Sequence, residues 1–383
     1  MKKPRPLTVA KPVRLIFVGG FLGSGKTTAL GALAKLLIRR GKRVGIVTND
    51  QSGNLTDTLV VRQMLDKLDV PVEEVVGGCF CCKFDELIDH MDKILAHEPD
   101  ILMGEPVGSC TDFVAAVANP IKINYRDGFI FAPFSTMVDP DRVRELLLGE
   151  SPTTFPEDVS YLFGKQLEEA DLIVLNKIDQ LRPEESKRLA GLLRQRFPAK
   201  QVLPISALEG KGMEAWLELL VTGRPGAATV LGQIDYDRYA HAEAVLGWLN
   251  AAVSISGKSP FNPAAMLENT ILRIRDTLRP RNAGIGHIKL AATSQGRSIW
   301  GNLTQLNGEP SLSDRHLGDV LSATLLVNAR VQMEPAELET IVRGAVADAA
   351  AEMGIEAEFI ELQCFSPAYP NPPYVVRQVE ASV

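Results

Sequence analysis

The feature that most constrains this chain is a glycine-rich stretch near its N-terminus, Gly20-Phe21-Leu22-Gly23-Ser24-Gly25-Lys26-Thr27. It has the spacing G-x-x-x-x-G-K-[ST], and it lies between an apolar, strand-like run at residues 13–18 and a helix-like segment that starts at Lys26. A strand, such a loop and a helix in this order are typical of a phosphate-binding loop. The alternative, a strand-turn-helix that binds nothing, fits these flanking segments poorly.

Each residue type in the loop suits a polyphosphate. Glycines clear the space, and backbone N–H groups at a helix N-terminus attract anions. We expect Lys26 to reach the outer phosphates and Thr27 to ligate Mg²⁺. The nucleotide-binding residues predicted here are Gly20, Gly23, Ser24, Gly25, Lys26, Thr27 and Thr28.

Length and composition exclude several classes of protein. A chain of 383 residues favours two domains, and a hydrophobic content of 45% with 23% charged residues is ordinary for a globular protein. The net charge of -6 argues against a general nucleic-acid binder. Residues 1–11 are basic but lack the apolar region of a signal peptide, and no run is long enough to span a membrane. We therefore expect a cytoplasmic protein that binds neither nucleic acid nor membrane.

Up to about residue 220, short apolar runs alternate with amphipathic stretches, which predicts an α/β fold with a mostly parallel sheet covered by helices, as in P-loop NTPases. The predicted strands are residues 13–18, 43–48, 72–76, 101–103, 128–138, 172–175 and 201–205. The predicted helices are residues 26–40, 55–68, 84–97, 141–148, 159–169, 183–196 and 213–221.

Ligands bind at the carboxyl edge of such a sheet. The groups that follow the strands there are residues 20–27, 49–50, 77–82, 105–108, 139, 176–179 and 206–207.

The sequence changes character after Gly223-Arg224-Pro225-Gly226, which reads as a linker. We expect a P-loop GTPase domain over residues 1–225 and a smaller α+β domain over residues 226–383. In the latter a strand-helix-strand unit occurs twice, which predicts the split βαβ type. Its predicted strands are residues 242–255, 286–292, 297–303, 320–331 and 355–364, and its predicted helices are residues 263–278 and 335–353. The proline-rich residues 367–373 should lie extended on the surface.

A second motif, Asn176-Lys177-Ile178-Asp179, directly follows the apolar run at residues 172–175. A carboxylate can accept hydrogen bonds from both N1–H and N2–H₂ of guanine, whereas adenine has an acceptor at N1, so Asp179 should select guanine. We expect Asn176 to address N7 and O6 and the Lys177 stem to cover the ring. Ser206-Ala207 is placed to help hold the base.

Two acidic groups should serve the metal and the attacking water. Glu105 ends the strand-like run Asp100-Ile101-Leu102-Met103-Gly104-Glu105 and is followed by Pro106-Val107-Gly108. It is therefore a candidate to hold Mg²⁺ or to position water. Asp50, after Asn49, stands where a nucleotide-sensing switch would begin; its alternative role is to cap the next helix. Lys26, Glu105 and Asp50 are the predicted catalytic residues.

Three thiols occur in the turn Gly77-Gly78-Cys79-Phe80-Cys81-Cys82. Cys79 and Cys82 have the C-x-x-C spacing of tetrahedral zinc sites, and Cys81 adds a third sulfur. Soft sulfur favours Zn²⁺, Cu(I) or a borderline ion such as Co²⁺ or Ni²⁺ over Mg²⁺. Buried small side chains or a redox pair are the alternatives. Cys110 either completes the metal site or is a small residue at a helix start.

Together these motifs resemble those of the CobW-like metallochaperone GTPases, relatives of UreG and HypB. The resemblance covers roughly the first 220 residues and includes Glu105-Pro106-Val107-Gly108 in the place of that family's E-x-x-G. It implies a GTPase that binds zinc, cobalt or nickel and assists its insertion into a client metalloprotein or corrinoid protein, with the smaller domain meeting the client. The chain differs in Thr48-Asn49-Asp50, which is closer to UreG, and its five histidines are scattered.

Three functions remain open at this point. The first is a GTP-hydrolysing metallochaperone or metallocofactor-maturation factor in which metal binding at the cysteine loop depends on the nucleotide. The second is a GTP-dependent reactivase or conformational chaperone of a metal- or corrinoid-containing enzyme, without metal delivery. The third, a small-molecule kinase, does not explain Asn176-Lys177-Ile178-Asp179. A homodimer is compatible with any of them.

Overall fold

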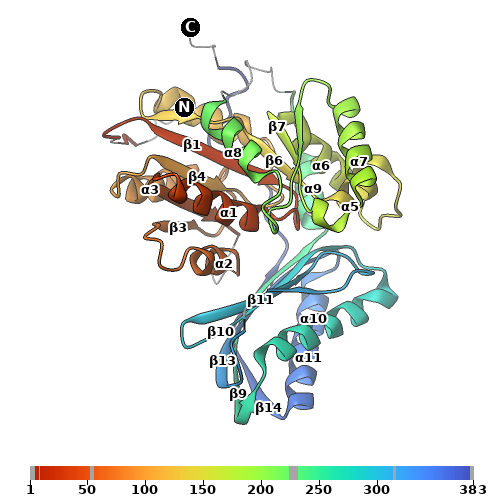
Figure 1. The fold of residues 1–383 in the computed structure, drawn as a ribbon. Helices are drawn as coiled ribbons and strands as arrows, with labels where there is room; N and C mark the ends of the chain where they lie inside the picture. The colour runs from red at the N-terminus through yellow and green to blue at the C-terminus, as the bar shows by residue number, and fades with distance from the viewer. Residues whose placement is uncertain (1–4, 8, 52–55, 224–231, 314–315, 380–383) are drawn as a thin grey trace.

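The computed structural model describes residues 5–7, 9–51, 56–223, 232–313 and 316–379. It contains two β-sheets, each with its own helices (Figure 1). The predicted linker lies outside these residues from Arg224 onward. In the described part of the chain, no helix has the length and apolar character needed to cross a membrane.

The first sheet has eight strands, and every pairing in it is parallel. Its order is β3-β2-β4-β1-β6-β7-β8, with β5 beside β1. The strands are β1 (Val13–Gly20), β2 (Val44–Asn49), β3 (Val72–Val75), β4 (Ile101–Glu105), β5 (Phe129–Phe131), β6 (Ser135–Val138), β7 (Leu172–Leu175) and β8 (Gln201–Pro204). The segment predicted as one strand at residues 128–138 forms two strands, β5 and β6. Pro133 lies between them and has no N–H group to donate to a neighbouring strand.

Helices cover both faces of this sheet, because alternate side chains of each strand point to opposite sides. In β1, the side chains of Leu15 and Phe17 enter the core beneath α3 (Phe84–Leu95) and α6 (Glu157–Glu169). The side chains of Ile16 and Val18 enter the core beneath α1 (Lys26–Arg39) and α8 (Met213–Thr222). The α-helices are α1 (Lys26–Arg39), α2 (Thr56–Met64), α3 (Phe84–Leu95), α4 (Asn119–Asn124), α5 (Pro140–Arg142), α6 (Glu157–Glu169), α7 (Pro183–Arg196) and α8 (Met213–Thr222). Two π-helical segments, η1 (Val114–Ala118) and η2 (Val143–Leu148), and one 3-10 helix, η3 (Ile178–Gln180), are also present. The helical segments at residues 114–124 were not predicted.

The second sheet is antiparallel and has the order β12-β11-β10-β13-β9-β14. Its elements are β9 (Gly247–Phe261), α10 (Pro263–Leu278), η4 (Arg279–Arg281), β10 (Ile285–Ser294), β11 (Arg297–Leu303), β12 (Ser311–Leu312), β13 (Val320–Val331), α11 (Pro335–Met353) and β14 (Ile355–Phe365). In the units β9-α10-β10 and β13-α11-β14, the two strands are separated in the sheet by another strand, which confirms the split βαβ prediction. Helices α10 and α11 pack together on one face.

One predicted strand is partly wrong. Residues 236–244 form helix α9 (Tyr236–Ala244), and β9 begins only at Gly247. The Asp235 side chain accepts hydrogen bonds from the backbone N–H groups of Asp237 and Arg238, so it caps the helix start. Helix α9 packs against α6, and its Tyr239 joins the core of the first sheet.

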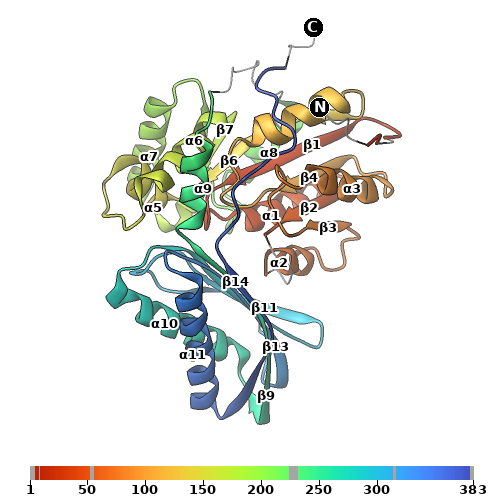
Figure 2. The same cartoon turned by 180° about the vertical axis from the view of Figure 1, so that it is seen from behind.

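The chain after β14 returns to the first sheet as an irregular tail, visible in blue in Figure 2. The Val376 N–H donates to the Ala115 carbonyl at 2.8 Å, and the Tyr374 ring meets Phe84 with centroids 4.9 Å apart. The proline-rich residues 367–373 form neither helix nor strand, and Pro367 and Pro370 are buried rather than on the surface as predicted. The tail thus packs against the start of α3, immediately after the cysteine turn.

Candidate functional site

The glycine-rich loop joins β1 to α1 at the carboxyl edge of the parallel sheet. Gly20 has a φ of 131°, and a Cβ at this position would lie 2.2 Å from the Met137 carbonyl oxygen of β6. Only glycine therefore fits where the loop leaves the sheet. Lys26 Nζ donates to the carbonyls of Gly20 at 2.8 Å and Phe21 at 3.3 Å. Its ammonium thus lies across the loop, where anionic oxygens can replace the two carbonyls.

Burial also shapes the electrostatics of this loop. Lys26 is 7% exposed, and burial lowers its pKa below the ordinary value, against the opposing effect of Glu105. An anionic ligand would restore the charged form, because it supplies the counter-charge that the interior lacks. The Ser24 hydroxyl has no hydrogen-bond partner within the described residues. The nucleotide contacts of Ser24 and Thr28 stay predictions.

Thr27 and Glu105 meet beside the loop. The Thr27 hydroxyl donates to Glu105 Oε1 at 2.9 Å, from α1 to the end of the neighbouring strand β4. Burial, together with the nearby Asp57 carboxylate, raises the pKa of Glu105 to about 7. Its second oxygen is buried, and no described residue donates a hydrogen bond to it. A hydroxyl and an unpartnered carboxylate oxygen are hard oxygen ligands, so the residues present fit Mg²⁺.

Asp50, the third predicted catalytic residue, is paired with the second domain. Arg330 Nη2 of β13 donates to both carboxylate oxygens of Asp50, at 3.0 and 3.2 Å. Burial raises the pKa of Asp50, although Arg330 opposes this shift. Helix α2 begins well after Asp50, at Thr56, and the carboxylate bonds to Arg330 and the Gln51 N–H. This arrangement links the end of β2 to the second sheet.

The loop after β7 carries the predicted base-reading residues. The Ser206 hydroxyl donates to Asp179 Oδ1, which orients the carboxylate. Lys177 Nζ pairs with Asp139 at 2.5 Å. The Asn176 amide donates to the Ser24 carbonyl at 2.9 Å and accepts from the Ala207 N–H at 3.0 Å. Asn176 therefore ties the phosphate loop to the loop after β8, and its contact with a base stays a prediction.

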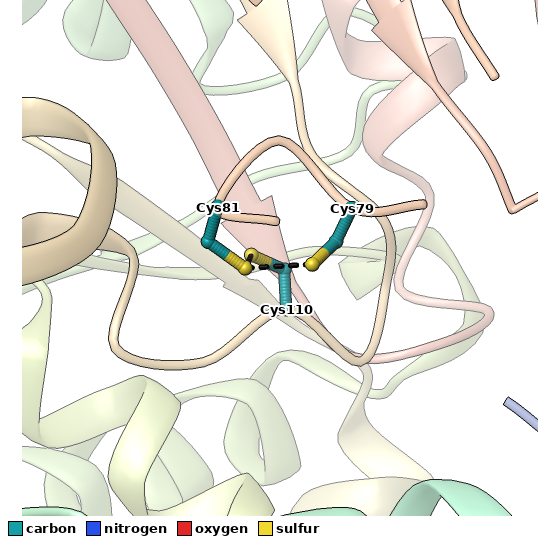
Figure 3. A group of neighbouring side chains, drawn as sticks. All are labelled: Cys79, Cys81 and Cys110. Carbon is teal, nitrogen blue, oxygen red and sulfur yellow. Dashed lines mark hydrogen bonds between the residues drawn. The ribbon is translucent and has the colours of Figure 1, made fainter. Parts of the chain in front are cut away.

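Three thiols converge at the cysteine turn, two of the three predicted ligands and Cys110, which the sequence left open as a further ligand. Cys79, Cys81 and Cys110 place their sulfur atoms within 4.8 Å of one another (Figure 3). The Sγ atoms of Cys79 and Cys81 lie 2.6 Å apart, and Cys110 Sγ is 3.7 Å from Cys81 Sγ. Cys82 follows in the turn and its thiol contacts Cys79, but its sulfur does not lie within that distance of all three others. Its role as a metal ligand stays a prediction. Three convergent thiols are a donor set for a soft or borderline ion.

The three thiols are buried, with exposures of 5%, 1% and 5% for Cys79, Cys81 and Cys110, among apolar side chains of the first core. Cys110 lies in a turn before η1 rather than at a helix start. Hydrogen bonds from Cys110, Cys81 and Cys82 lower the pKa of the Cys79 thiol well below its usual range. The same cluster raises the pKa of Cys82 to about 12, mainly through Cys79. The thiols of this cluster therefore titrate as a coupled group rather than independently.

Two connections join the thiol cluster to the nucleotide side. Asn49, next to Asp50, donates to the Gly78 carbonyl and accepts from the Phe80 N–H, both at 2.8 Å. The segment from Glu105 to Cys110 forms the second connection. Within it Gly108 packs on the phosphate loop, because a Cβ there would lie 3.0 Å from the Leu22 backbone nitrogen.

Two residues of α9 border the thiols and were missed from the sequence. Glu243 is 3% exposed, and burial, followed by the influence of Cys79, raises its pKa to about 8. Tyr239 accepts a hydrogen bond from the Thr111 N–H at 3.3 Å. The signal that could have found them is the helix cap at Asp235, which places residues 236–244 on a helix rather than a strand.

These features define a class. A parallel sheet with helices on both faces, a phosphate loop after β1, an acidic residue at the end of β4 and the Asn176–Asp179 loop after β7 make this a P-loop nucleotide-binding protein. Residues 14–204 match the model of the CobW/HypB/UreG nucleotide-binding domain. The chain belongs to this family.

Two of the relatives that match this chain carry zinc in their names. "Zinc chaperone CobW" of Pseudomonas aeruginosa is 28% identical over 57% of this chain and 65% of its own length. "Zinc-regulated GTPase metalloprotein activator 1" of Schizosaccharomyces pombe is 28% identical over 45% of this chain and 41% of its own length. The match thus spans less than two thirds of either relative. Among solved structures, HypB from Helicobacter pylori in complex with nickel is 18% identical, with a TM-score of 0.37, over 55% of this chain and 86% of its own.

Proposed function

We propose that this protein is a GTP-hydrolysing metallochaperone or metallocofactor-maturation factor, which binds Zn²⁺, Co²⁺ or Ni²⁺ through cysteine thiols according to its nucleotide state. The observation that carries the proposal is the segment from Glu105 to Cys110. It has the acidic residue of the phosphate site at one end, a thiol of the cluster at the other, and Gly108 against the phosphate loop between them. A displacement of Glu105 by nucleotide would therefore shift Cys110.

The contacts described above suggest a role for each residue of the proposed nucleotide site. Lys26 and the loop N–H groups bind the phosphates, and Asp179, oriented by Ser206, reads guanine. Thr27 and Glu105 would hold Mg²⁺, which supplies counter-charge to the phosphates when bound. Glu105, with a pKa of about 7, can also hold a water proton at its unpartnered oxygen.

The second domain is proposed to meet the client, a metalloprotein or corrinoid protein, in the cytoplasm. Its sheet contacts α2 and pairs Arg330 with Asp50, so a change around the nucleotide reaches it directly. The five cysteines are free thiols, consistent with a reducing compartment.

The second candidate, a GTP-dependent reactivase in which the cysteines sense rather than deliver a metal, is favoured by one observation. All three clustered thiols are buried in an apolar core, with at most 5% exposure. A site that hands its ion to another protein must open, whereas a sensing site can remain closed.

Titration with Co²⁺, with and without GTP and Mg²⁺, separates the candidates. Delivery predicts an intense thiolate-to-cobalt absorption band whose affinity changes with nucleotide and which is lost in Cys79→Ser and Cys81→Ser. Absence of the band in the unmodified protein would favour the second candidate.

Two further variants identify the third sulfur. The geometry predicts that Cys110→Ser weakens the band while Cys82→Ser leaves most of it. The reverse result would restore Cys82 as the ligand. Cys364→Ser is the matched control, because Cys364 is a half-buried thiol on β14 of the other sheet.

A further inference from the structure

The two faces of the second sheet are covered by different domains. In β10, Ile288 and Leu290 point into the core beneath α10 and α11. The alternate residues, His287, Lys289 and Ala291, point to the opposite face. There Ala291 forms a small apolar cluster with Leu59 of α2, so this face rests on the first domain.

The first turn of α2 is held by the second sheet. The Thr56 N–H donates to Asn328 Oδ1 of β13 at 3.0 Å, so a side chain of the other domain satisfies this helix N-terminus. Next to it, Lys289 Nζ donates to both oxygens of Asp57, at 2.6 and 2.8 Å. The cation of β10 is thus fixed at the start of α2.

Strand β10 also lies against the phosphate loop. A Cβ on Gly286, three residues before Lys289, would lie 2.8 Å from Leu22 Cδ1, and a Cβ on Gly23 would lie 3.3 Å from the Gly286 carbonyl oxygen. Burial acts to raise the pKa of Asp57, but Lys289 and, less strongly, Lys26 lower it. Lys289 in turn affects the charge state of Lys26 and Glu105. A lysine of the second domain is therefore anchored on a strand that packs against the loop proposed to bind the phosphates.

We propose that Lys289 binds the γ-phosphate of GTP, so that the second domain distinguishes a bound triphosphate from a diphosphate. This inference rests on the proposed GTP-binding function. A lysine carries a compact charge on a flexible four-carbon stem, so it can leave Asp57 for a phosphate oxygen beside Thr27. Strand β10 pairs with β13, and both strands contact the start of α2. A movement of Lys289 would therefore change the contact between the second sheet and the first domain.

The inference predicts a selective loss of affinity. In Lys289→Ala, a fluorescent non-hydrolysable GTP analogue in Mg²⁺ buffer should bind about tenfold or more weakly, as for a lost charge-assisted hydrogen bond. Fluorescent GDP should bind within about twofold of the unmodified protein, because it lacks the group that Lys289 contacts. Lys289→Arg should retain most of the preference for the triphosphate. Lys258→Ala, an exposed lysine of β9 in the same sheet, is the control and should change neither affinity.

A double variant guards against a folding effect. Lys289→Ala leaves Asp57 without its partner, whereas Lys289→Ala with Asp57→Asn removes both charges and should still lose the triphosphate selectively. Equal affinity losses for both nucleotides, or none, would overturn the inference. If the unmodified protein binds the analogue and Lys26→Ala prevents this while Lys289→Ala does not, only the role of Lys289 fails. If the unmodified protein binds neither nucleotide, the proposed function fails with it.

Discussion

Asn49 is the residue whose replacement most directly tests the link between the nucleotide side and the thiols. It is 8% exposed at the end of β2, and its amide donates to the carbonyls of Val75 at 3.0 Å and Gly78 at 2.8 Å. Its oxygen accepts from the Phe80 N–H. Asn49→Ala removes all three bonds at once.

The loss of stability of the turn depends on which hydrogen bonds each partner of Asn49 keeps. The Val75 carbonyl still accepts from the Asp50 N–H, and Gly78 is a half-buried residue, so water can replace the lost bond to its carbonyl. The Phe80 N–H is buried and is left unsatisfied, which costs about 1–3 kcal/mol. With about 1 kcal/mol for the Gly78 bond, the native turn should lose about 2–4 kcal/mol. If the turn must re-form to bind metal, Co²⁺ affinity should fall by up to roughly 30- to 900-fold.

The assay is a Co²⁺ titration followed through the thiolate band, with amide hydrogen exchange of the cysteine turn as a second reading. Asn124→Ala is the matched control, since Asn124 is an exposed residue at the end of α4 whose side chain donates to the Pro120 carbonyl of its own helix. Co²⁺ affinity and exchange within about twofold of the unmodified protein would refute the reasoning that Asn49 positions the turn.

Two further predictions concern the base and the domain contact. Asp179→Asn should lower GTP affinity about 10- to 100-fold without creating ATP binding, measured by nucleotide competition; unchanged GTP affinity would place base reading elsewhere. Arg330→Met leaves the Asp50 carboxylate buried without its cation, so unfolding free energy should fall by about 3–5 kcal/mol in urea melts near neutral pH. Burial already raises the pKa of Asp50, and loss of Arg330 raises it further, so stability should be lost as pH rises through that pKa. The deficit should therefore be smaller at about pH 5 than at about pH 7.5, and adding Asp50→Asn should restore most of it; a pH-independent deficit would contradict the argument.

The sequence was sufficient to predict the arrangement of the first sheet, because the phosphate loop and the acidic and polar groups each follow an apolar strand. Residues 49–50, 105–108 and 176–179 all lie at the carboxyl edge, as expected for parallel strands. The second domain also followed from periodicity alone, since its helices and most of its strands begin within a residue or two of the predicted positions.

The composition of the thiol cluster could not be predicted in the same way. Spacing in the chain favours Cys82, but Cys110 reaches Cys81 because the loop after β4 folds over the phosphate loop. That closure depends on tertiary packing, which no local pattern encodes. Lys289 and Arg330 were missed for a related reason: they are single cations on strands without a motif. Their one signal is alternation, which leaves polar side chains on a sheet face that should otherwise be covered by apolar ones.

The returning tail has a mechanical consequence for the second domain. That domain is joined to the first on one side through α9, which packs on α6, and on the other through Val376 and Tyr374, which hold the tail against η1 and α3. These two connections flank the sheet face that rests on α2, and together with it they oppose separation of the domains. A truncation before Tyr374 would remove one of the two connections and would uncover the start of α3 beside the cysteine turn.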